Sequence, residues 1–213
     1  HNYKNEAQIL KIKHKNLIHE ITVNLVGKIQ LKNILMAVIA ASKSNLDLKK
    51  IFSVIPRLSP VEGRFEKVGK IKNKSLVFLD YAHTPDALQT CILNIREQFP
   101  DKHISVLFGC GGDRDKGKRS KMGKIADKYG DKIYITDDNP RREVPKKIRD
   151  EIKRGIKKNQ IIEISNRKKA IVKAINNLNT GDILRVAGKG HEKIQQIGNR
   201  KVFLSDRQII LNS

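Results

Sequence analysis

The segment TDDNPRREVP, residues 136–145, concentrates acids, an amide and two arginines in one short connection. It follows a short apolar run and precedes a lysine-rich segment with helical spacing. Asp, Asn and Pro are ordinary turn residues, and Pro140 favours an extended conformation at Asn139. A turn requires neither the second acid nor the arginines. A loop with these side chains suits a zwitterion, because carboxylates accept from an ammonium group while a guanidinium pairs with a carboxylate.

A second polar segment, GCGGDRDKGKR, covers residues 109–119 and nearly matches a phosphate-binding loop. The glycine spacing and Lys118 fit that pattern. Arg119, however, stands where a Ser or Thr must bind Mg²⁺, and two acids inside the loop would repel a polyphosphate. This mismatch disfavours a nucleotide-hydrolysing loop. The competing interpretation is that the glycines let the loop bend sharply while Arg114 offers a planar fork to a carboxylate.

A third cluster, DYAHTPDAL, covers residues 80–88. Thr84 is suited to cap a helix whose first residue is Pro85, which explains that part of the segment structurally. Capping leaves Asp80, Tyr81 and His83 unexplained. An Asp at a strand end with a His three residues later suits either a structural role or the binding of a ribose hydroxyl, a base or a metal.

A fourth cluster, GKGHE, covers residues 188–192 and follows an apolar run. Gly188 and Gly190 permit close approach of the backbone, and Glu192 supplies an anion. A glycine-rich turn into a hairpin explains most of this segment, so alone it is a weak functional signal.

The elements that must position these clusters alternate along the chain after residue 60. Apolar, β-type runs are separated by stretches with helical spacing. We expect strands at 75–80, 104–109, 132–136, 160–164 and 182–187, helices at about 85–98, 121–129, 146–157 and 168–177, and a closing hairpin near Gly198-Asn199. This order predicts a doubly wound, mostly parallel α/β sheet. Ligands in such sheets bind beyond the carboxyl ends of the strands, so all four clusters should open onto one rim.

The first 60 residues have a different pattern. Residues 6–25 alternate as a hairpin, whereas 33–42 and 47–55 have helical spacing. We therefore place a domain boundary near Pro60, giving domains 1–60 and 61–213. The chain starts without an initiator Met and with a strand-like run, so we expect it to be part of a longer protein.

Length and composition fit this division. A chain of 213 residues with 38% hydrophobic residues can bury one sizeable core and a smaller one. No apolar run approaches the roughly 18 residues that would indicate a membrane span, so we expect no membrane contact. The two cysteines lack metal-ligand spacing, which favours a reduced, cytoplasmic setting.

The net charge of +22, from 44 basic and 22 acidic residues, raises the alternative of a basic nucleic-acid-binding module. The lysines are scattered through every segment, however, and aromatic residues make up only 5% of the chain. No helix-turn-helix, zinc or aromatic-rich RNA-binding signature is present. The pattern favours a solvated lysine-rich surface, and we expect no nucleic-acid partner.

Taken together, DYAHTPDAL, GCGGDRDKGKR, DDNPR and GKGHE, in this order and spacing, resemble the Mur ligase family. The resemblance covers essentially the whole chain. Residues 61–213 resemble the Rossmann-like C-terminal domain, and residues 1–60 resemble the end of the central ATP-binding α/β domain. It implies an ATP-dependent ligase of cytoplasmic peptidoglycan precursor synthesis. In that reaction a carboxylate of UDP-N-acetylmuramoyl-L-alanyl-D-glutamate is activated as an acyl phosphate and attacked by the amine of an amino acid.

The DNPR element marks the family members that use meso-diaminopimelate, and it argues against a lysine-adding or folate-glutamate ligase. The resemblance implies that Arg114 and Arg141 grip a carboxylate of the amino acid. The residues that would complete this pocket are Asp138, Asn139, Pro140, Gly188 and Glu192. Lysine-adding relatives lack the second arginine, because lysine has no second carboxylate.

For ATP, the resemblance implies that Asn33 faces the adenine, while Arg64 and Asp80 meet the phosphates and ribose, with His83 nearby. The stretch GKIQLKN around Asn33 departs from the family pattern GxFNVSN at three positions. The family's phosphate-binding loop, Mg²⁺ ligands and UDP-binding domain would all precede residue 1. We therefore expect no catalytic residue and no metal ligand on this chain, no turnover by it alone, and a monomer.

Overall fold

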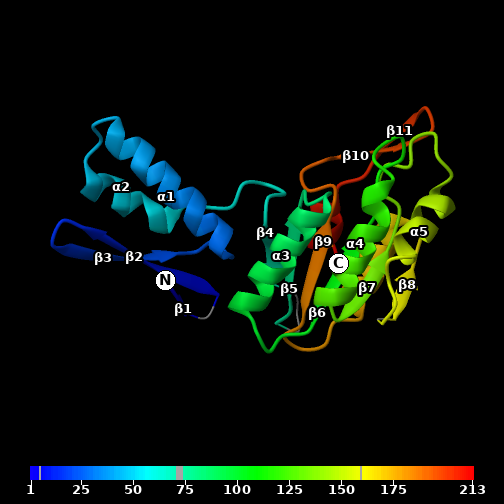
Figure 1. The fold of residues 1–213 in the computed structure, drawn as a ribbon, viewed down its shortest axis with the longest axis horizontal. Helices are drawn as coiled ribbons and strands as arrows, with labels where there is room; N and C mark the ends of the chain where they lie inside the picture. The colour runs from blue at the N-terminus through cyan, green and yellow to red at the C-terminus, as the bar shows by residue number, and fades with distance from the viewer. Residues whose placement is uncertain (5, 71–73, 159) are drawn as a thin grey trace.

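The computed structural model describes residues 1–4, 6–70, 74–158 and 160–213 (Figure 1). The N-terminal part holds a three-stranded antiparallel sheet in the order β1-β2-β3. Its elements are β1 (Asn2–Lys4), β2 (Ala7–His14), β3 (Leu17–Val23), α1 (Lys28–Lys43), α2 (Leu48–Val54) and the 3-10 turn η1 (Ile55–Arg57). The expected hairpin and both expected helices are present, and their apolar faces form one small core.

The larger part is built on a six-stranded sheet in the order β4-β5-β9-β6-β7-β8. The strands are β4 (Glu66–Lys70), β5 (Leu76–Asp80), β6 (Ile104–Phe108), β7 (Lys132–Ile135), β8 (Ile161–Glu163) and β9 (Ile183–Ala187). Only β4, at one edge, is antiparallel to its neighbour. All residues of β5, β6 and β9 are buried, as expected for parallel strands covered on both faces. The predicted doubly wound, mostly parallel sheet is confirmed.

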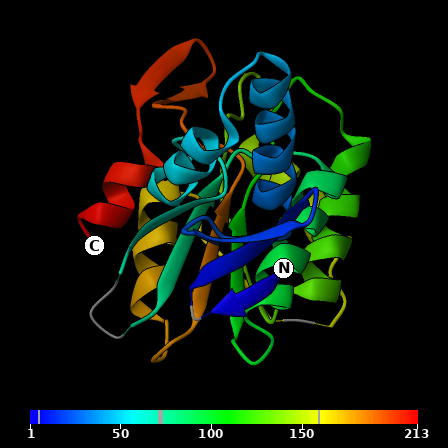
Figure 2. The ribbon, with the colours of Figure 1, turned by 90° about the vertical axis from the view of Figure 1, so that its left-hand side faces the viewer.

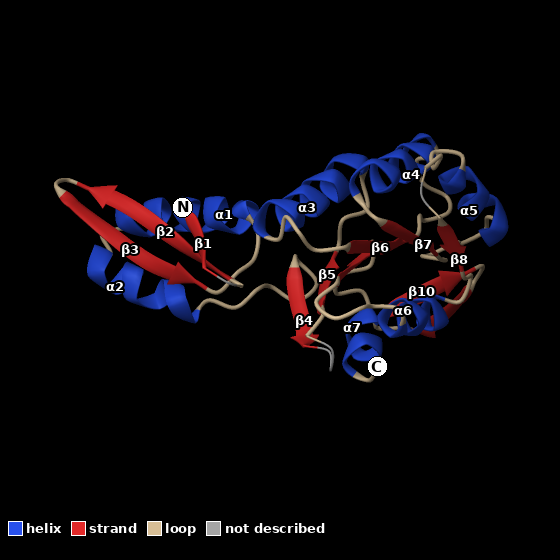
Figure 3. Ribbon diagram, turned by 90° about the horizontal axis from the view of Figure 1, so that it is seen from below, coloured by secondary structure: helices blue, strands red, loops and turns tan. Residues whose placement is uncertain are grey.

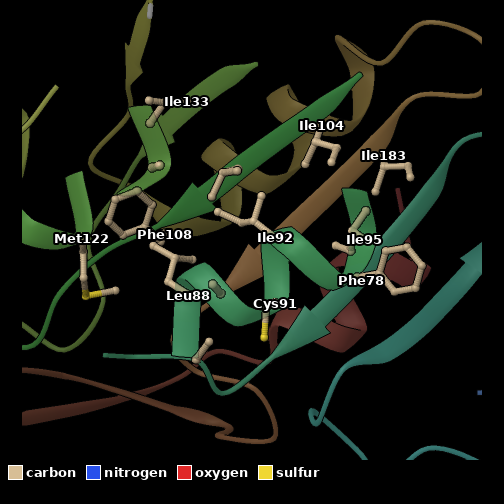
Figure 4. Close-up of a cluster of buried hydrophobic side chains, with 14 of the residues drawn as sticks. Phe78, Leu88, Cys91, Ile92, Ile95, Ile104, Phe108, Met122, Ile133 and Ile183 are labelled. Atoms are coloured by element: carbon tan, nitrogen blue, oxygen red, sulfur yellow. The ribbon is translucent and has the colours of Figure 1, made fainter. Parts of the chain in front are cut away.

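Helices cover both faces of this sheet (Figure 3). On one face lie α3 (Pro85–Gln98), α4 (Gly117–Tyr129) and α5 (Pro145–Lys153), and on the other lie α6 (Arg167–Asn176) and α7 (Asp206–Leu211). Figure 4 shows Leu88, Ile92 and Ile95 of α3 packed in a cluster with Phe78 and Phe108 of the sheet. A short hairpin, β10 (Ile194–Ile197) and β11 (Arg200–Phe203), follows β9.

Helix α3 begins as its sequence predicts. The Oγ1 atom of Thr84 accepts from the backbone N of Ala87 at 3.3 Å, and Pro85 is the first helical residue. Tyr81 and His83 lie in the short connection between the end of β5 at Asp80 and this cap, so the cap helps to fix the path of that connection.

Several boundaries differ from the sequence prediction. Helix α4 begins at Gly117 rather than near residue 121, and α5 ends at Lys153 rather than near 157. The α5 helix stops because Gly155 is packed against the backbone of α4, where a Cβ atom would lie 1.9 Å from Ser120 O. Strand β4 and helix α7 were not predicted at all.

The two parts of the chain contact each other beside α3 (Figure 2). The side chain of Gln98 accepts from Gly27 N at 3.0 Å and donates to Glu6 O at 3.1 Å. Asn94 Oδ1 accepts from Ile29 N at 3.1 Å. The boundary near Pro60 stays a prediction. Among the described residues, no helix is both long and apolar enough to cross a membrane.

Candidate functional site

The four polar clusters meet beyond the carboxyl ends of β5, β6, β7 and β9, around a cavity of about 470 Å³. Every cluster contributes to its wall, as predicted from the topology. The lining residues are Tyr81, His83, Thr84, Gly109, Cys110, Gly111, Arg114, Asp115, Lys118, Asp138, Asn139, Arg141, Gly188 and Glu192. Six of the seven residues expected to hold the amino acid line this cavity, and the seventh, Pro140, is buried between Asn139 and Arg141 without lining it.

Asn139 is held by hydrogen bonds at both ends of its amide. Its Nδ2 donates to Glu192 Oε2 at 3.1 Å, and its Oδ1 accepts from Gln196 N at 3.0 Å and from Lys189 Nζ at 3.4 Å. The buried Asn139 side chain therefore ties the loop after β7 to the GKGHE segment and to β10. Its position is fixed by the protein itself.

Arg141 occupies the left-handed region, with φ of 51°. The β10–β11 hairpin holds this conformation, because Arg141 N donates to Gln196 O at 3.1 Å and Gly198 N donates to Arg141 O at 2.6 Å. The Arg141 Nη1 atom donates to Gly112 O at 2.8 Å. Its other guanidinium nitrogens have no hydrogen-bond partner within the described ranges, so most of the fork stays available at the cavity wall.

Lys189 was not singled out from the sequence, yet its side chain is completely buried beside the cavity. Its Nζ donates to Ile194 O at 2.6 Å and to Glu192 Oε2 at 3.2 Å. Tyr81 OH also donates to Glu192, at 3.3 Å. Burial opposes ionisation of Glu192, but the Lys189 ammonium and these hydrogen bonds hold its pKa below the ordinary value. Glu192 therefore presents a fixed anion.

Asp138 is buried in the cavity wall. Burial raises the pKa of its carboxyl group, although Arg167 and Lys189 act in the opposite direction. Gly188 lies directly opposite with φ of 113°, and a Cβ atom there would come within 2.7 Å of Asp138 Oδ2. A glycine is required at this position so that the carboxylate and the backbone can approach each other.

The glycine-rich loop after β6 shows why Arg119 stands in place of a Ser or Thr. The Arg119 side chain is fully buried and donates to Glu143, to Glu151 and to Gly111 O. Arg119 is thus an internal clamp of the loop. Arg114, by contrast, is exposed at the cavity wall, and within the described residues its one hydrogen bond is to Asp113 O, at 3.1 Å.

Asp80, expected near the ribose and phosphates, does not line the cavity. Its carboxylate forms a buried ion pair with Arg185 and accepts from Phe65 N at 3.0 Å and from Cys91 Sγ at 2.8 Å. Burial would raise the pKa of Asp80, but Arg185 and these hydrogen bonds bring it below the ordinary value. The structure therefore places this carboxylate in a buried cluster with Arg185 and Cys91 rather than in the cavity wall.

The other residues expected to meet ATP lie in two places. The Arg64 guanidinium stacks on the Tyr81 ring, 4.5 Å from its centroid, and the His83 ring meets the same tyrosine edge-on at 4.7 Å. Asn33 is on α1, where it lines a separate apolar hollow between α1 and α2. No cluster of three or more potential metal ligands occurs among the residues that the structure describes. The nucleotide roles stay predictions.

Comparison with known proteins shows which proteins this chain resembles in sequence and in fold. The family model "Mur ligase, glutamate ligase domain" matches residues 63–190. The chain is 42% identical over 206 residues to UDP-N-acetylmuramoyl-L-alanyl-D-glutamate–2,6-diaminopimelate ligase of Rickettsia felis, covering 96% of this chain and 38% of that protein. It is 46% identical over 189 residues to the protein of the same name from Rhizobium meliloti, covering 89% and 38%. The chain thus spans less than half the length of these relatives.

Solved structures agree with these sequence relatives. A structure of UDP-N-acetylmuramoyl-L-alanyl-D-glutamate–2,6-diaminopimelate ligase superposes with a TM-score of 0.75 at 30% identity, covering 99% of this chain and 43% of that one. The UDP-N-acetylmuramate-alanine ligase MurC of Thermotoga maritima superposes with a TM-score of 0.65 at 19% identity, covering 87% and 40%. This second likeness shows the fold alone.

Proposed function

Because this chain belongs to the Mur ligase family, we propose that it forms the amino-acid-receiving part of an ATP-dependent ligase. The reaction adds meso-diaminopimelate to UDP-N-acetylmuramoyl-L-alanyl-D-glutamate during peptidoglycan precursor synthesis. One observation carries the proposal. Two arginine forks, Arg114 and Arg141, and two carboxylates, Asp138 and Glu192, line a single cavity at the carboxyl ends of the parallel strands.

The cavity chemistry matches a doubly zwitterionic amino acid. A guanidinium fork pairs with a substrate carboxylate in a bidentate way, which an isolated ammonium cannot reproduce. Glu192 is held ionised and is suited to accept from a substrate ammonium. The same ammonium would favour ionisation of Asp138, whose pKa burial raises in the absence of a ligand. The two arginines supply guanidinium groups that can pair with a second substrate carboxylate. Lysine has no second carboxylate and would leave that pairing capacity unused.

The contribution of this chain to the reaction is positioning. An amine reacts with an activated carboxyl carbon only when the two are held close and aligned, and a rigid cavity supplies that alignment. Rigidity here comes from Asn139, Lys189 and the β10–β11 hairpin, which fix the wall before any ligand binds. The substrate is thus received by a wall in which Asn139 and Glu192 are already held in place.

ATP, when bound, supplies the phosphoryl group that activates the acyl substrate. The residues at the cavity rim fit a contact with a nucleotide, because the exposed Arg64 guanidinium and the His83 ring flank Tyr81. Asp80 would act through its buried ion pair with Arg185, which supports the loop that carries His83. Asn33, on α1, would contact the adenine from the N-terminal part. The Mg²⁺ ligands would come from a part of the enzyme outside this chain.

Calorimetric titration of the chain with meso-diaminopimelate and with L-lysine tests the proposal. We expect meso-diaminopimelate to bind at least about tenfold more tightly, since a forked charge-assisted bond is worth roughly 1.5–3 kcal/mol. The same preference should remain in the Arg142→Ala variant, which serves as a control because that arginine is exposed and lies outside the cavity. Equal affinities for the two amino acids would contradict the proposal.

A further inference from the structure

Another hollow, of about 510 Å³, lies between α4 and the turn that follows α5, and it shares no lining residue with the amino-acid cavity. Six basic side chains line it: Lys121, Lys124, Lys128, Arg154, Lys157 and Lys158. Asp127 is the only acidic residue among its lining residues. We call this space the basic hollow.

The basic hollow is built on direct backbone packing between two elements. A Cβ atom at Gly123 of α4 would lie 2.2 Å from Ile152 O, and one at Gly155 would lie 1.9 Å from Ser120 O. Two glycines therefore let α4 and the end of α5 touch, with α4 beside α5 as Figure 1 shows. This contact holds lysines of α4 and cations of the following turn around one space.

Within the described residues, the cations of the basic hollow have no ion-pair partners, and Asp127 is the one carboxylate in its lining. None of its six cations forms an ion pair with a carboxylate in the described part of the chain, whereas Lys146, Arg149 and Lys153 of the adjacent α5 helix are all paired. Asp127 accepts from the backbone of Lys157 at 3.0 Å and of Lys158 at 3.1 Å, so its carboxylate caps the turn.

We propose that the basic hollow binds a short chain of phosphate groups, as found in inorganic tripolyphosphate or in the tail of a nucleotide. Six cations around one concave space favour a ligand with several closely spaced negative charges. The volume is that of a small-molecule site. Among the described residues that line the hollow none is aromatic, so they offer no platform on which nucleic-acid bases could stack. This inference does not depend on the proposed ligase function.

The test is calorimetric titration of the 213-residue chain with sodium tripolyphosphate at about 0.15 M salt, with a chelator present to remove metal ions. The variant is Lys121→Gln/Lys124→Gln/Arg154→Gln. The matched control, Lys147→Gln/Lys169→Gln/Lys173→Gln, removes the same charge from exposed helix positions outside the hollow. We expect the first variant to bind on the order of tenfold more weakly and the control to change less than about twofold.

Two further measurements make the test decisive. The amide resonances of Ser120 and Gly155, which line the hollow, should shift on titration of the unaltered chain with tripolyphosphate. ATP should compete with tripolyphosphate and orthophosphate should not, because the phosphate chain is what the hollow recognises. Equal weakening in both triple variants would overturn the proposal, as it would show a response to net charge alone. Binding of a single-stranded RNA oligomer, but not of tripolyphosphate, would also overturn it.

Discussion

Arg119 donates to both carboxylate oxygens of Glu143, with nitrogen–oxygen distances of 2.9 Å for each bond. Glu143 also accepts from Asp113 N at 2.7 Å. The bidentate pair joins the first turn of α4 to the segment after β7, and the Asp113 bond joins the glycine-rich loop to the same glutamate. These are the two sides of the cavity that carry Arg114 and Arg141. The spacing between the two proposed carboxylate-binding arginines therefore depends on a residue that does not line the cavity.

Arg119→Thr should destabilise the chain and should not create nucleotide hydrolysis, although it restores the phosphate-binding pattern. Removing one partner of a buried ion pair costs roughly 3–5 kcal/mol, because Glu143 and Glu151 lose their cation. Urea unfolding measures the loss, and a phosphate-release assay checks for hydrolysis. Arg142→Thr is the control, since Arg142 is 81% exposed and its pair should contribute less than about 1 kcal/mol. Phosphate release by Arg119→Thr would show that the loop is a phosphate cradle.

The same pair predicts a pH dependence of stability. The bonds from Arg119 lower the pKa of Glu143 from its ordinary 4.5 to about 2. Its contribution is therefore fully present above about pH 4.5 and is lost as the pH falls towards 2. Glu143→Gln should lower the free energy of unfolding at pH 7 and flatten its decline below pH 4.5. Glu97→Gln, at an exposed position, should keep the decline of the unaltered chain. If the free energy of unfolding of Glu143→Gln fell as steeply below pH 4.5 as that of the unaltered chain, the assignment of this pH dependence to Glu143 would be contradicted.

The sequence predicted the location of the candidate site better than the contacts that fix its side chains in place. Strand ends in a parallel sheet share one edge, so the positions of Asp138 and Glu192 followed from the element order alone. The role of Arg119 did not follow, because its partners are 24 and 32 residues away and only the fold brings them together. The burial of the Lys189 ammonium also could not be predicted, because nothing in the surrounding glycine-rich segment distinguishes a buried lysine from an exposed one.

Two elements were missed for local reasons. Strand β4 is an edge strand interrupted by Gly69, whose φ is 69°, and its pairing with β5 shifts register there. Helix α7 is only six residues long and is held by the buried ion pair between Asp206 and Arg167, a long-range contact. Short elements that depend on tertiary contacts leave little periodicity for a sequence pattern to reveal.

Lys189→Met should raise the pKa of Glu192, because the variant loses the buried ammonium that favours the ionised carboxylate while burial still opposes it. Carboxyl carbon NMR titration of Glu192 measures this value directly. Lys193→Met, an exposed neighbour, serves as the control. We also expect weaker binding of meso-diaminopimelate, since Asn139 and Glu192 lose a shared donor. An unchanged Glu192 titration would mean that Lys189 only fills space.

The most direct test of the central claim is the substrate dependence of Arg141→Ala. The assay uses a chimeric ligase in which this chain replaces the matching part of the Rickettsia felis relative, with each substrate varied in turn. We predict a tenfold to hundredfold loss, or roughly 1.5–3 kcal/mol, in kcat/KM for meso-diaminopimelate, with little change for ATP or the UDP-linked dipeptide. Arg141→Lys should recover only part, because an ammonium lacks the fork. An equal loss for all three substrates, or no loss for meso-diaminopimelate, would contradict the claim that this loop receives the amino acid.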